Sequence, residues 1–306
     1  MLLKRISDYV LRSRLDAMLA AFICAFIPLI GGLSIVIAAF VTLRKGIYEG
    51  TLVVIAATLP ILIGYWAYPG SEQEVGLSVT QVLFLMLATN GLTWMFAVWL
   101  RQYSSWSLLL QGVALLGVIT VGMVHYLSPD IQAFWDKQLT SYFTHVIQNT
   151  NTDAGPMTEM ELRNIIGYVK RYMTGVVFIF ITFNALLQVF LARWWQAVVF
   201  NPGGLRKELC DIRMGHVIGV IFVLGLVYSY WNNDVIVDIM PILYLVFGLA
   251  GFSLLHAMIG TRKTGWIWIA LMYGALIIVP IIAVMIAMLA LIDTWVDFRS
   301  RLTKQT

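Results

Sequence analysis

Eight long apolar stretches, each bounded by charged residues, take up most of the 306-residue chain. They cover residues 17–42, 51–68, 79–99, 105–127, 172–192, 214–231, 239–260 and 265–292. Most are long enough to cross a hydrocarbon layer of about 30 Å as an α-helix. Because lipid offers no partner to backbone N–H and C=O groups, each stretch should be helical. The pattern predicts an all-α, polytopic transmembrane helical bundle of about eight spans.

Composition supports one membrane domain over residues 1–306. Hydrophobic residues make up 60% of the chain and charged residues 12%, with a mean hydropathy of +0.85, which leaves too little polar surface to coat a water-soluble globule. Cys24 and Cys210 lack the paired spacing of a disulfide or zinc framework. The net charge of +4 is explained by the positions of Lys and Arg relative to a membrane, so we expect no nucleic-acid partner.

Basic residues are distributed unevenly between alternate loops, which is the signal that orients membrane helices. One set of loops contains Arg44, Lys45, Arg101, Arg193, Arg206, Lys207, Arg213, Arg262 and Lys263. The other set contains Lys137, Arg163, Lys170 and Arg171, together with the acidic residues Glu72, Glu74, Asp130, Asp136, Asp153, Glu159, Glu161, Asp234 and Asp238. The first set and the N-terminus are therefore predicted to be cytoplasmic, and the second set extracytoplasmic.

The first apolar stretch creates a parity problem. If residues 17–42 crossed once, Arg44 and Lys45 would lie outside. The stretch contains Pro28, Gly31 and Gly32, which can break a helix and form a re-entrant hairpin. We favour a broken or re-entrant hairpin, and a single crossing remains the alternative.

The C-terminal stretch carries a similar signal. With one crossing by residues 265–292, the basic C-terminal tail would lie outside, opposite to the side that its charge favours. Pro280 lies inside this stretch and is a candidate for a second break.

Residues 1–16 are predicted to form a basic interfacial helix. Apolar side chains lie on one side and basic side chains elsewhere, which is typical of a helix on an anionic leaflet. A frayed basic tail is the alternative. The apolar residues are Leu2, Leu3, Ile6, Tyr9 and Val10, and the basic ones are Lys4, Arg5 and Arg12.

The longest connection, residues 128–171, is predicted to be an extracytoplasmic amphipathic helical insert. Ser128 and Pro129 form a helix start signal, and apolar residues then recur at helical spacing. Residues 148–156 form a polar turn, and Thr158 with Glu161 makes a capping-box pattern for a second helix. The apolar stripe of this insert must lie on lipid headgroups, cap the bundle or contact a partner.

The loop after residue 192 carries a resemblance to a known family. The run Arg193, Trp194, Trp195 and Gln196, followed by Asn201, Pro202, Gly203, Gly204, Arg206 and Glu208, resembles the YybS-like family of predicted bacterial membrane proteins. The likeness extends more loosely over most of the chain. It implies a multi-pass protein of the bacterial cytoplasmic membrane, distantly similar to substrate-binding components of energy-coupling-factor transporters. It implies no reaction.

The same loop also has a local interpretation. The Arg193, Trp194 and Trp195 cluster is expected to anchor a span end at the interface. Asn201 to Gly204 form a turn signal, and the basic residues after it could bind a lipid phosphate or an acidic partner. The Gly-Lys-Ser/Thr ending of a nucleotide-binding loop is absent.

Small residues recur at helical spacing in two places and are candidates for docking another membrane protein. They are Ala17, Ala21 and Ala25 in the first stretch, and Gly215 with Gly219 in the sixth. Such spacing lets two helices approach closely. Packing inside the chain itself is the alternative for both sets.

Polar residues at membrane depth are the candidate ligand contacts. They are Asn184, Gln188, Asn90 and Gln111. Asn184 and Gln188 lie one turn apart, so both amides could serve one ligand, although hydrogen bonding between helices is the alternative. No acidic residue is predicted deep within a span, which argues against a proton relay.

Other chemistry finds little support. The four histidines lack metal-ligand spacing, and no nucleophile motif occurs, so we expect no metal, no cofactor and no enzymatic activity. Two hypotheses remain. The first is a substrate-binding membrane component of a small-molecule uptake system energised by partner subunits. The second is a non-catalytic membrane scaffold or assembly factor that binds other membrane proteins.

Overall fold

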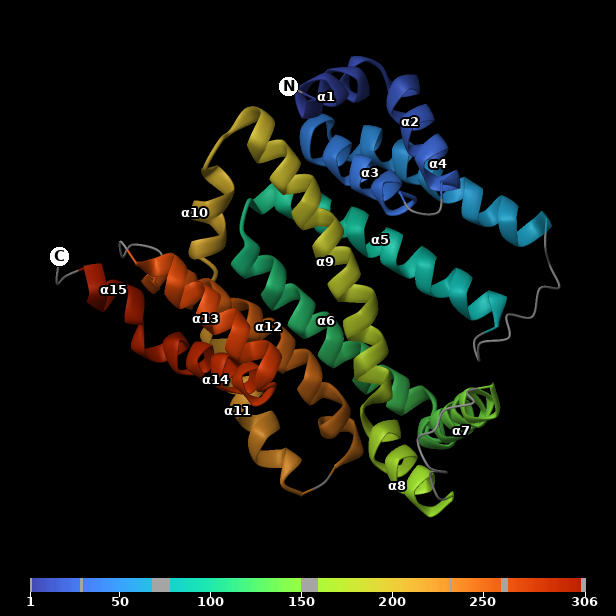
Figure 1. Cartoon of the computed structure of the whole chain (residues 1–306), viewed down its shortest axis with the longest axis vertical. Coiled ribbons are helices and arrows are strands. Elements are labelled where there is room, and N and C mark those ends of the chain that lie inside the picture. Colours follow the sequence, from blue (N-terminus) through green and yellow to red (C-terminus); the bar gives the residue numbers. More distant parts are fainter. Residues whose placement is uncertain are drawn as a thin grey trace. The chain divides into compact units, whose positions relative to one another are not determined.

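A computed structural model describes residues 2–27, 30–67, 78–149, 159–231, 233–259 and 264–303. All regular elements within these ranges are helices (Figure 1). They are α1 (Leu2–Arg12), α2 (Arg14–Phe26), α3 (Gly32–Lys45), α4 (Ile47–Ala67), α5 (Val79–Tyr103), α6 (Trp106–Leu127), α7 (Ile131–Asn149), α8 (Glu159–Val169), η1 (Lys170–Tyr172), α9 (Met173–Phe200), α10 (Gly204–Cys210), α11 (His216–Ser229), α12 (Asp234–Ile259), α13 (Gly265–Ile278), α14 (Ile281–Val296) and α15 (Phe298–Thr303).

Five helical segments among the described residues are long and apolar enough to cross a membrane. They are α4, α5, α6, α12 and the continuous run Met160–Phe200 that includes α9. The prediction of an all-α protein with several membrane-spanning helices is confirmed at this level. The other apolar stretches form helices of only 13 to 16 residues, namely α2, α3, α11, α13 and α14.

The chain divides into two compact units. Unit 1 contains Met1–Ser104 and Phe180–Lys207, and unit 2 contains Ser105–Ile179 and Glu208–Thr306. Helix α9 contributes its first residues to unit 2 and the rest to unit 1. The expected single domain is therefore one chain with two packing units, each of which is described by itself below.

In unit 1 the first apolar stretch is broken, as predicted. Helix α2 ends at Phe26 and α3 begins at Gly32, while Pro28 lies outside the described residues. An ion pair of 2.6 Å joins Arg14 Nε, at the start of α2, to Glu49 Oε1, at the start of α4. Because α3 ends only two residues before α4 begins, both ends of the α2–α3 pair lie at one end of unit 1.

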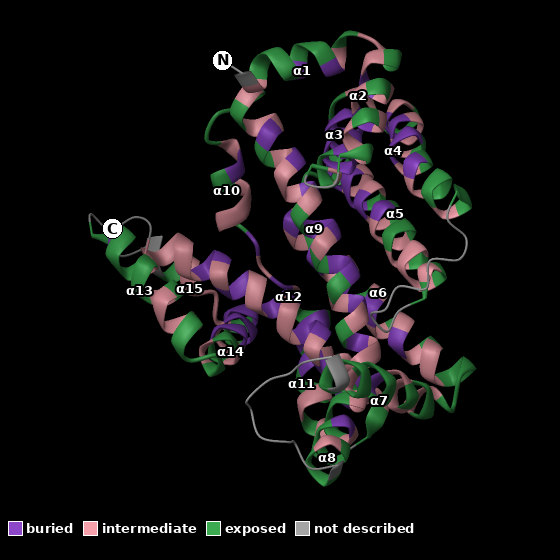
Figure 2. Ribbon diagram, turned by 45° about the vertical axis from the view of Figure 1, so that its right-hand side comes forward, coloured by how far each residue is buried: buried purple, intermediate pink, exposed green. Residues whose placement is uncertain are grey.

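Helix α3 forms the centre of unit 1. Every residue from Ser34 to Leu43 is buried, and Figure 2 shows α3 mostly in the colour of buried residues. Its Phe40 ring stacks on Trp195 with centroids 4.5 Å apart, and Trp195 Nε1 donates to Ser7 Oγ of α1 at 2.8 Å. Arg101 donates to the carbonyl oxygens at the end of α3, 2.9 Å from that of Leu43.

Helix α1 confirms the predicted N-terminal helix but divides its apolar side in two. Ser7 and Val10 are buried within unit 1, whereas Ile6 and Tyr9 stay exposed. The contact between Ser7 and Trp195 places α1 near the C-terminal end of α9. Only part of the predicted lipid-facing surface is therefore available to lipid.

In unit 2 the C-terminal segment lies beside Arg213. An ion pair of 2.9 Å joins Arg213 Nη1 to Asp297 Oδ2, and Arg299 Nη2 donates to the carbonyl oxygen of Ile212 at 2.8 Å. The C-terminal segment therefore lies at the same end of unit 2 as Arg213, whereas a single crossing by residues 265–292 would place it at the other end. A break that turns the chain back accounts for this arrangement.

That break lies at Pro280, as suspected from the sequence. Helix α13 ends at Ile278 and α14 starts at Ile281. Tyr273 of α13 stacks on Phe252 in the C-terminal half of α12, and Arg299, just after α14, donates to Ser253 Oγ of the same half. The α13–α14 pair therefore leaves the C-terminal half of α12 and comes back to it.

The predicted insert is a pair of helices, α7 and α8. Trp135 Nε1 donates to Thr174 Oγ1 at 2.9 Å, and Lys170 forms a 2.7 Å ion pair with Asp136. Leu139 and Ile166 are the buried apolar contacts of the two helices. The predicted capping residue Thr158 lies outside the described residues.

Candidate functional sites

Helix α5 carries a polar stripe through the apolar interior of unit 1. Asn90 and Thr93 are three residues apart and both are buried, and Thr89 lies on the neighbouring position of the same face. Helix α5 packs on the buried helix α3. Burying hydroxyl and amide groups here costs free energy unless each finds a partner.

One of the predicted ligand residues meets this stripe. Thr93 Oγ1 donates to Gln188 Oε1 of α9 at 2.6 Å, and it also lies 2.8 Å from the carbonyl oxygen of Thr89. One hydroxyl proton can serve only one of these two acceptors at a time. The group formed by Asn90, Thr93 and Gln188 is called the α5–α9 polar layer below.

Two other predicted ligand residues lie elsewhere. Asn184 Nδ2 donates to the carbonyl oxygen of Phe180 in its own helix at 2.7 Å. Gln111 Nε2 donates to the carbonyl oxygen of Ser107, and its Oε1 lies against Gly215 in unit 2. Of the four predicted ligand residues, Gln188 contacts the α5 stripe that contains Asn90, and Thr93 is the member of the stripe that sequence reasoning missed.

A nearby donor in α5 has no partner. Among the described residues, Trp94 Nε1 is buried and makes no hydrogen bond. Within the described part of the chain, Thr182 Oγ1 of α9 is likewise buried and makes no hydrogen bond. Buried polar groups in proteins are nearly always hydrogen-bonded, so unpaired donors next to a polar stripe indicate a place for water or a ligand.

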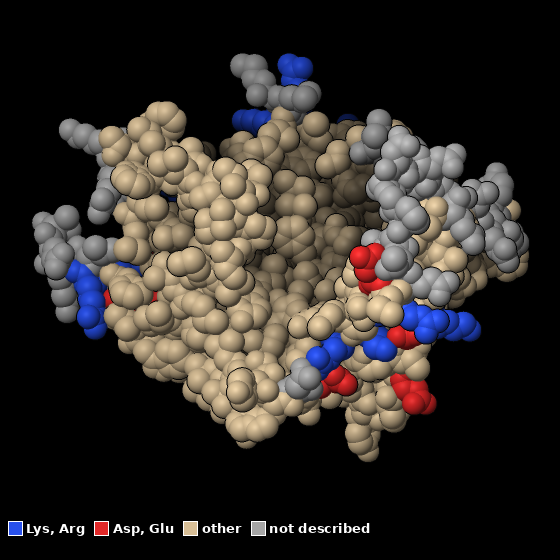
Figure 3. Space-filling model, turned by 60° about the horizontal axis from the view of Figure 1, so that its bottom comes forward, with Lys and Arg blue, Asp and Glu red and all other residues tan. Residues whose placement is uncertain are grey.

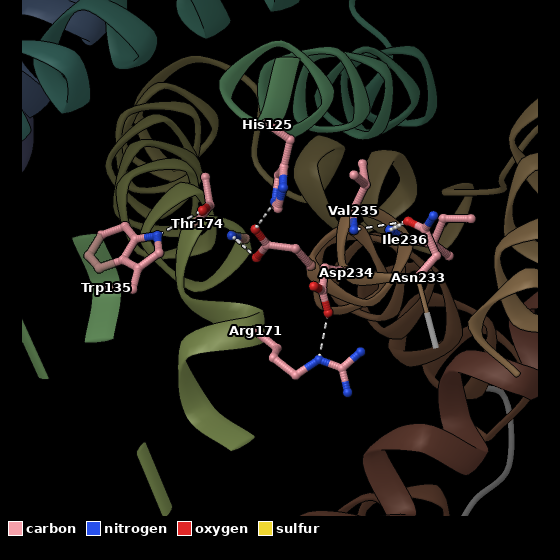
Figure 4. A network of polar contacts seen from close by, with 10 residues as sticks. His125, Trp135, Arg171, Thr174, Asn233, Asp234, Val235 and Ile236 are labelled. Carbon is pink, nitrogen blue, oxygen red and sulfur yellow. Dashed lines mark hydrogen bonds and ion pairs between the residues drawn. The ribbon is translucent and has the colours of Figure 1, made fainter. Parts of the chain in front are cut away.

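Unit 2 contains a buried acid–imidazole pair, which is drawn in Figure 4. Asp238 Oδ2 lies 2.9 Å from His125 Nε2, and the backbone N–H of Gly175 donates to Asp238 Oδ1 at 2.6 Å. Asp238 is 0% exposed. The charge pattern predicts Asp238 in an extracytoplasmic loop, whereas it lies one turn inside α12, which begins at Asp234, and is buried against α6 and α9.

The pair joins three helices closely. A side chain at Gly175 would collide with the carbonyl oxygen of Asp238, so glycine is required for α9 to approach α12. Arg171 forms a 2.8 Å ion pair with Asp234 on one side of the pair, and Trp135 meets Thr174 on the other (Figure 4). The hydrogen bonds of Asp238 to His125 and to the backbone of Gly175 thus link α6, α9 and α12.

The opposite end of unit 2 contains a second polar cluster. Asp293 is buried and accepts from the backbone N–H of Phe298 at 2.8 Å, while Arg213 donates to the carbonyl oxygen of Asp293 at 3.1 Å. Burial lowers the pKa of Arg299, against the attraction of Asp293. These contacts join the C-terminal segment to Arg213. Within the described residues, no group of three His, Cys, Asp or Glu side chains could bind a metal ion.

The loop that carries the family resemblance contains a turn and short-range hydrogen bonds. Gly203 has φ +85°, and the backbone N–H of Gly204 donates to the carbonyl oxygen of Asn201, which confirms the predicted turn. Arg193 Nη1 donates to Gln196 Oε1 at 2.7 Å. In unit 2, Glu208 Oε2 accepts from Trp106 Nε1 at 3.3 Å.

The two tryptophans of this loop have different roles. Trp194 is exposed, as expected of an interface anchor. Trp195 is buried between Phe40 and Ser7, so the expectation that it anchors a span end is wrong. Its indole instead ties α9 to α1 and α3.

The small-residue faces are used inside the chain. Ala17 and Ala21 are buried within unit 1, and only Ala25 is partly accessible. In unit 2, Gly215 lies against Gln111, and Gly219 is covered by the side chains of Thr294 and Trp295. Ala17, Ala21 and Gly219 therefore pack inside their units, which is the alternative given for both sets, while Ala25 and Gly215 are half-buried.

Comparison with known proteins gives no identification. No family model, no curated protein and no solved structure matches the chain. The class of protein therefore rests on the fold and the two sites described above.

Proposed function

We propose that this chain is the solute-binding membrane component of a small-molecule uptake system, energised by partner subunits. The observation that carries the proposal is the α5–α9 polar layer, where Asn90, Thr93 and Gln188 are embedded in apolar helices beside the unpaired donor Trp94 Nε1. Intramembrane polar groups of this kind mark ligand or ion pathways in many membrane proteins. No charged side chain takes part in the layer, which favours an uncharged, polar ligand.

The helix breaks support the same function. Each unit contains one apolar stretch interrupted by Gly or Pro, α2–α3 in unit 1 and α13–α14 in unit 2. Each helix of these pairs is about 20–24 Å long, shorter than a hydrocarbon core of about 30 Å. Short, interrupted segments in the two halves of a chain are typical of transporters, because broken backbone is tolerated only where it faces a cavity or protein.

We infer that both pairs are re-entrant hairpins. Helices α4, α5, α6, α9 and α12 then cross the membrane. Helix α11 is as short as the hairpin helices, but it also crosses in this topology because it joins the basic loop of Arg213 to the acidic start of α12. Both termini lie on the cytoplasmic side of a bacterial cytoplasmic membrane. The charge distribution supports this topology, since the N-terminal helix, the loop of Arg213 and the C-terminal tail are all basic. It also places α7 and α8 on the extracytoplasmic side.

The test is ligand-induced thermal stabilisation of the purified full-length protein. A panel of water-soluble vitamins is the first choice of ligands, because the family resemblance implies kinship with vitamin-binding components. A ligand that binds only the folded state raises the melting temperature in proportion to the logarithm of its concentration. Thr93→Val and Gln188→Leu should each reduce that rise, because each removes one hydrogen-bonding group of the layer.

Asn184→Leu is the matched control. It lies one turn from Gln188 on the same helix, but its amide is satisfied by the carbonyl oxygen of Phe180. It should therefore keep the full ligand response. Equal responses from Asn184→Leu, Thr93→Val and Gln188→Leu would reject the α5–α9 polar layer as the ligand site.

The alternative is a non-catalytic scaffold or assembly factor. It is supported by the exposed apolar side chains on the insert, including Tyr142 and Val146 of α7 and Met160 of α8. A scaffold should co-purify with protein only and show no ligand response. Mass spectrometry of both proteins and small molecules in one pull-down separates the two functions.

A further inference from the structure

Helices α7 and α8 leave much of their apolar surface uncovered. On α7, Trp135 and Leu139 face the chain, whereas Phe134, Tyr142 and Val146 are exposed. On α8, Ile166 is buried, whereas Met160 and Tyr168 are exposed. An uncovered apolar face on a folded, anchored helix pair requires an occupant.

Exposed aromatic residues from other elements lie at the same end of unit 2. Tyr126 follows His125 directly, Tyr172 lies next to Arg171, and Tyr230 and Trp231 precede α12 by a few residues. Their exposed fractions are 84% for Tyr126, 41% for Tyr172, 90% for Tyr230 and 67% for Trp231. The contacts of His125 with Asp238 and of Arg171 with Asp234 place these residues at about the same height along the helices of unit 2. This set is called the aromatic girdle below.

The girdle indicates lipid as the occupant. Tyr and Trp gather at the membrane–water boundary because an apolar ring and a polar tip suit that level. The exposed apolar surface of the spans leads directly to the girdle, since Ile119 and Met123 precede Tyr126 on α6 and are also exposed. The face of the insert therefore continues a lipid-facing surface.

Charge agrees with this placement. The cations where the insert joins α9 are paired, Lys170 with Asp136 and Arg171 with Asp234. In the view of Figure 3, charged side chains of both signs lie in small groups, and the rest of the visible described surface is uncharged. Paired charges beside an apolar, aromatic face suit the headgroup layer, where both water and acyl chains are within reach.

We propose that α7 and α8 lie in the lipid headgroup layer, with Tyr142 and its apolar neighbours inserted toward the acyl chains. The insert is then an interfacial helix pair that contacts the membrane and not a water-exposed domain. The polar side of α7, which includes Thr144, faces water. This placement is independent of whether the α5–α9 polar layer binds a ligand.

The experiment compares Tyr142→Cys with Thr144→Cys, each labelled with a small environment-sensitive fluorophore. Both positions are exposed, and they lie about 200° apart around the helix. The full-length protein, with Cys24 and Cys210 replaced by Ala, is placed in phosphatidylcholine–phosphatidylglycerol nanodiscs. Quenching is measured with lipid spin-labelled near the headgroup and, separately, with aqueous iodide.

We expect the spin-labelled lipid to quench the label at position 142 severalfold more than the label at 144, and iodide to show the reverse order. Strong iodide quenching at both positions would overturn the proposal by placing the insert in water. Shielding of position 142 from both quenchers would overturn it by showing a protein contact. Val146→Cys provides a second probe of the same face and should behave like Tyr142→Cys.

Discussion

The two broken hairpins are both apolar, but their surroundings differ greatly. Helix α3 is buried at every position from Ser34 to Leu43, whereas α13 has Gly265 as its one buried residue among those described. Side-chain size accounts for the difference. Helix α3 contains Ser34, Ala38 and Ala39, which allow neighbours to approach on all sides, while α13 presents large side chains such as Trp266 and Trp268. An apolar sequence therefore accompanies both a buried helix and an exposed one.

The largest expected effect comes from replacing one aromatic side chain in each hairpin by alanine. Phe40 is 0% exposed and stacks on Trp195, so Phe40→Ala should cost about 3–5 kcal/mol through lost contacts and a cavity. Trp268→Ala in α13 should change stability by less than about 1 kcal/mol, because the side chain is exposed. Thermal unfolding in one detergent measures both. Equal losses would remove the distinction between the hairpins.

A second prediction concerns the packing of α14 on α12. A side chain at Gly251 would collide with the carbonyl oxygen of Ile286, so Gly251→Leu should cost about 1–3 kcal/mol or more by separating α12 from α14. Gly248→Leu is the control on the same helix, since nothing lies within 4 Å of its added side chain. If both variants give the same yield of monodisperse protein, α14 does not pack on α12 as described.

The smallest effect concerns the end of the second hairpin. The backbone N–H of Ser300, followed by the charge of Arg213, lowers the pKa of Asp297 below its ordinary value of 3.8. A lowered folded-state pKa stabilises the fold above the unfolded value and loses this effect as pH falls through the folded value. Asp297→Asn should therefore be slightly less stable than the wild type near neutral pH. The difference should shrink as pH falls below 3.8 and disappear once Asp297 is protonated in the folded state. A difference that grows on acidification would contradict the assignment.

Much of the fold could be predicted from hydropathy and helix breakers. The breaks near Pro28 and at Pro280, the N-terminal helix and the two helices of the insert follow from local pattern alone. The buried pair of His125 and Asp238 could not be predicted, because Asp238 reads as a loop residue until the start of α12 is known. Asn233 supplies a cap signal for that start, since its Oδ1 accepts from the backbone N–H of Val235.

Only part of the candidate site could be predicted from the sequence. One-turn spacing put Asn184 and Gln188 on one face, but the amide of Asn184 satisfies itself within its own helix. Thr93 was missed because threonine commonly bonds to its own helix backbone and gives no signal of a partner. Small-residue spacing likewise cannot tell an internal contact at Ala21 from an external one.

The most direct test of the account is the side of the membrane on which the C-terminal tail lies relative to the loop of Arg213 and to the insert. Single cysteines are placed at Arg301 and at Thr144 and compared with native Cys210, using a membrane-impermeant thiol reagent on intact cells. With two returning hairpins, we expect labelling at position 144, protection at Cys210 and equal protection at position 301, with all sites labelled after lysis. Labelling at position 301 with protection at Cys210 would show that α13 and α14 cross the membrane, and would contradict two returning hairpins.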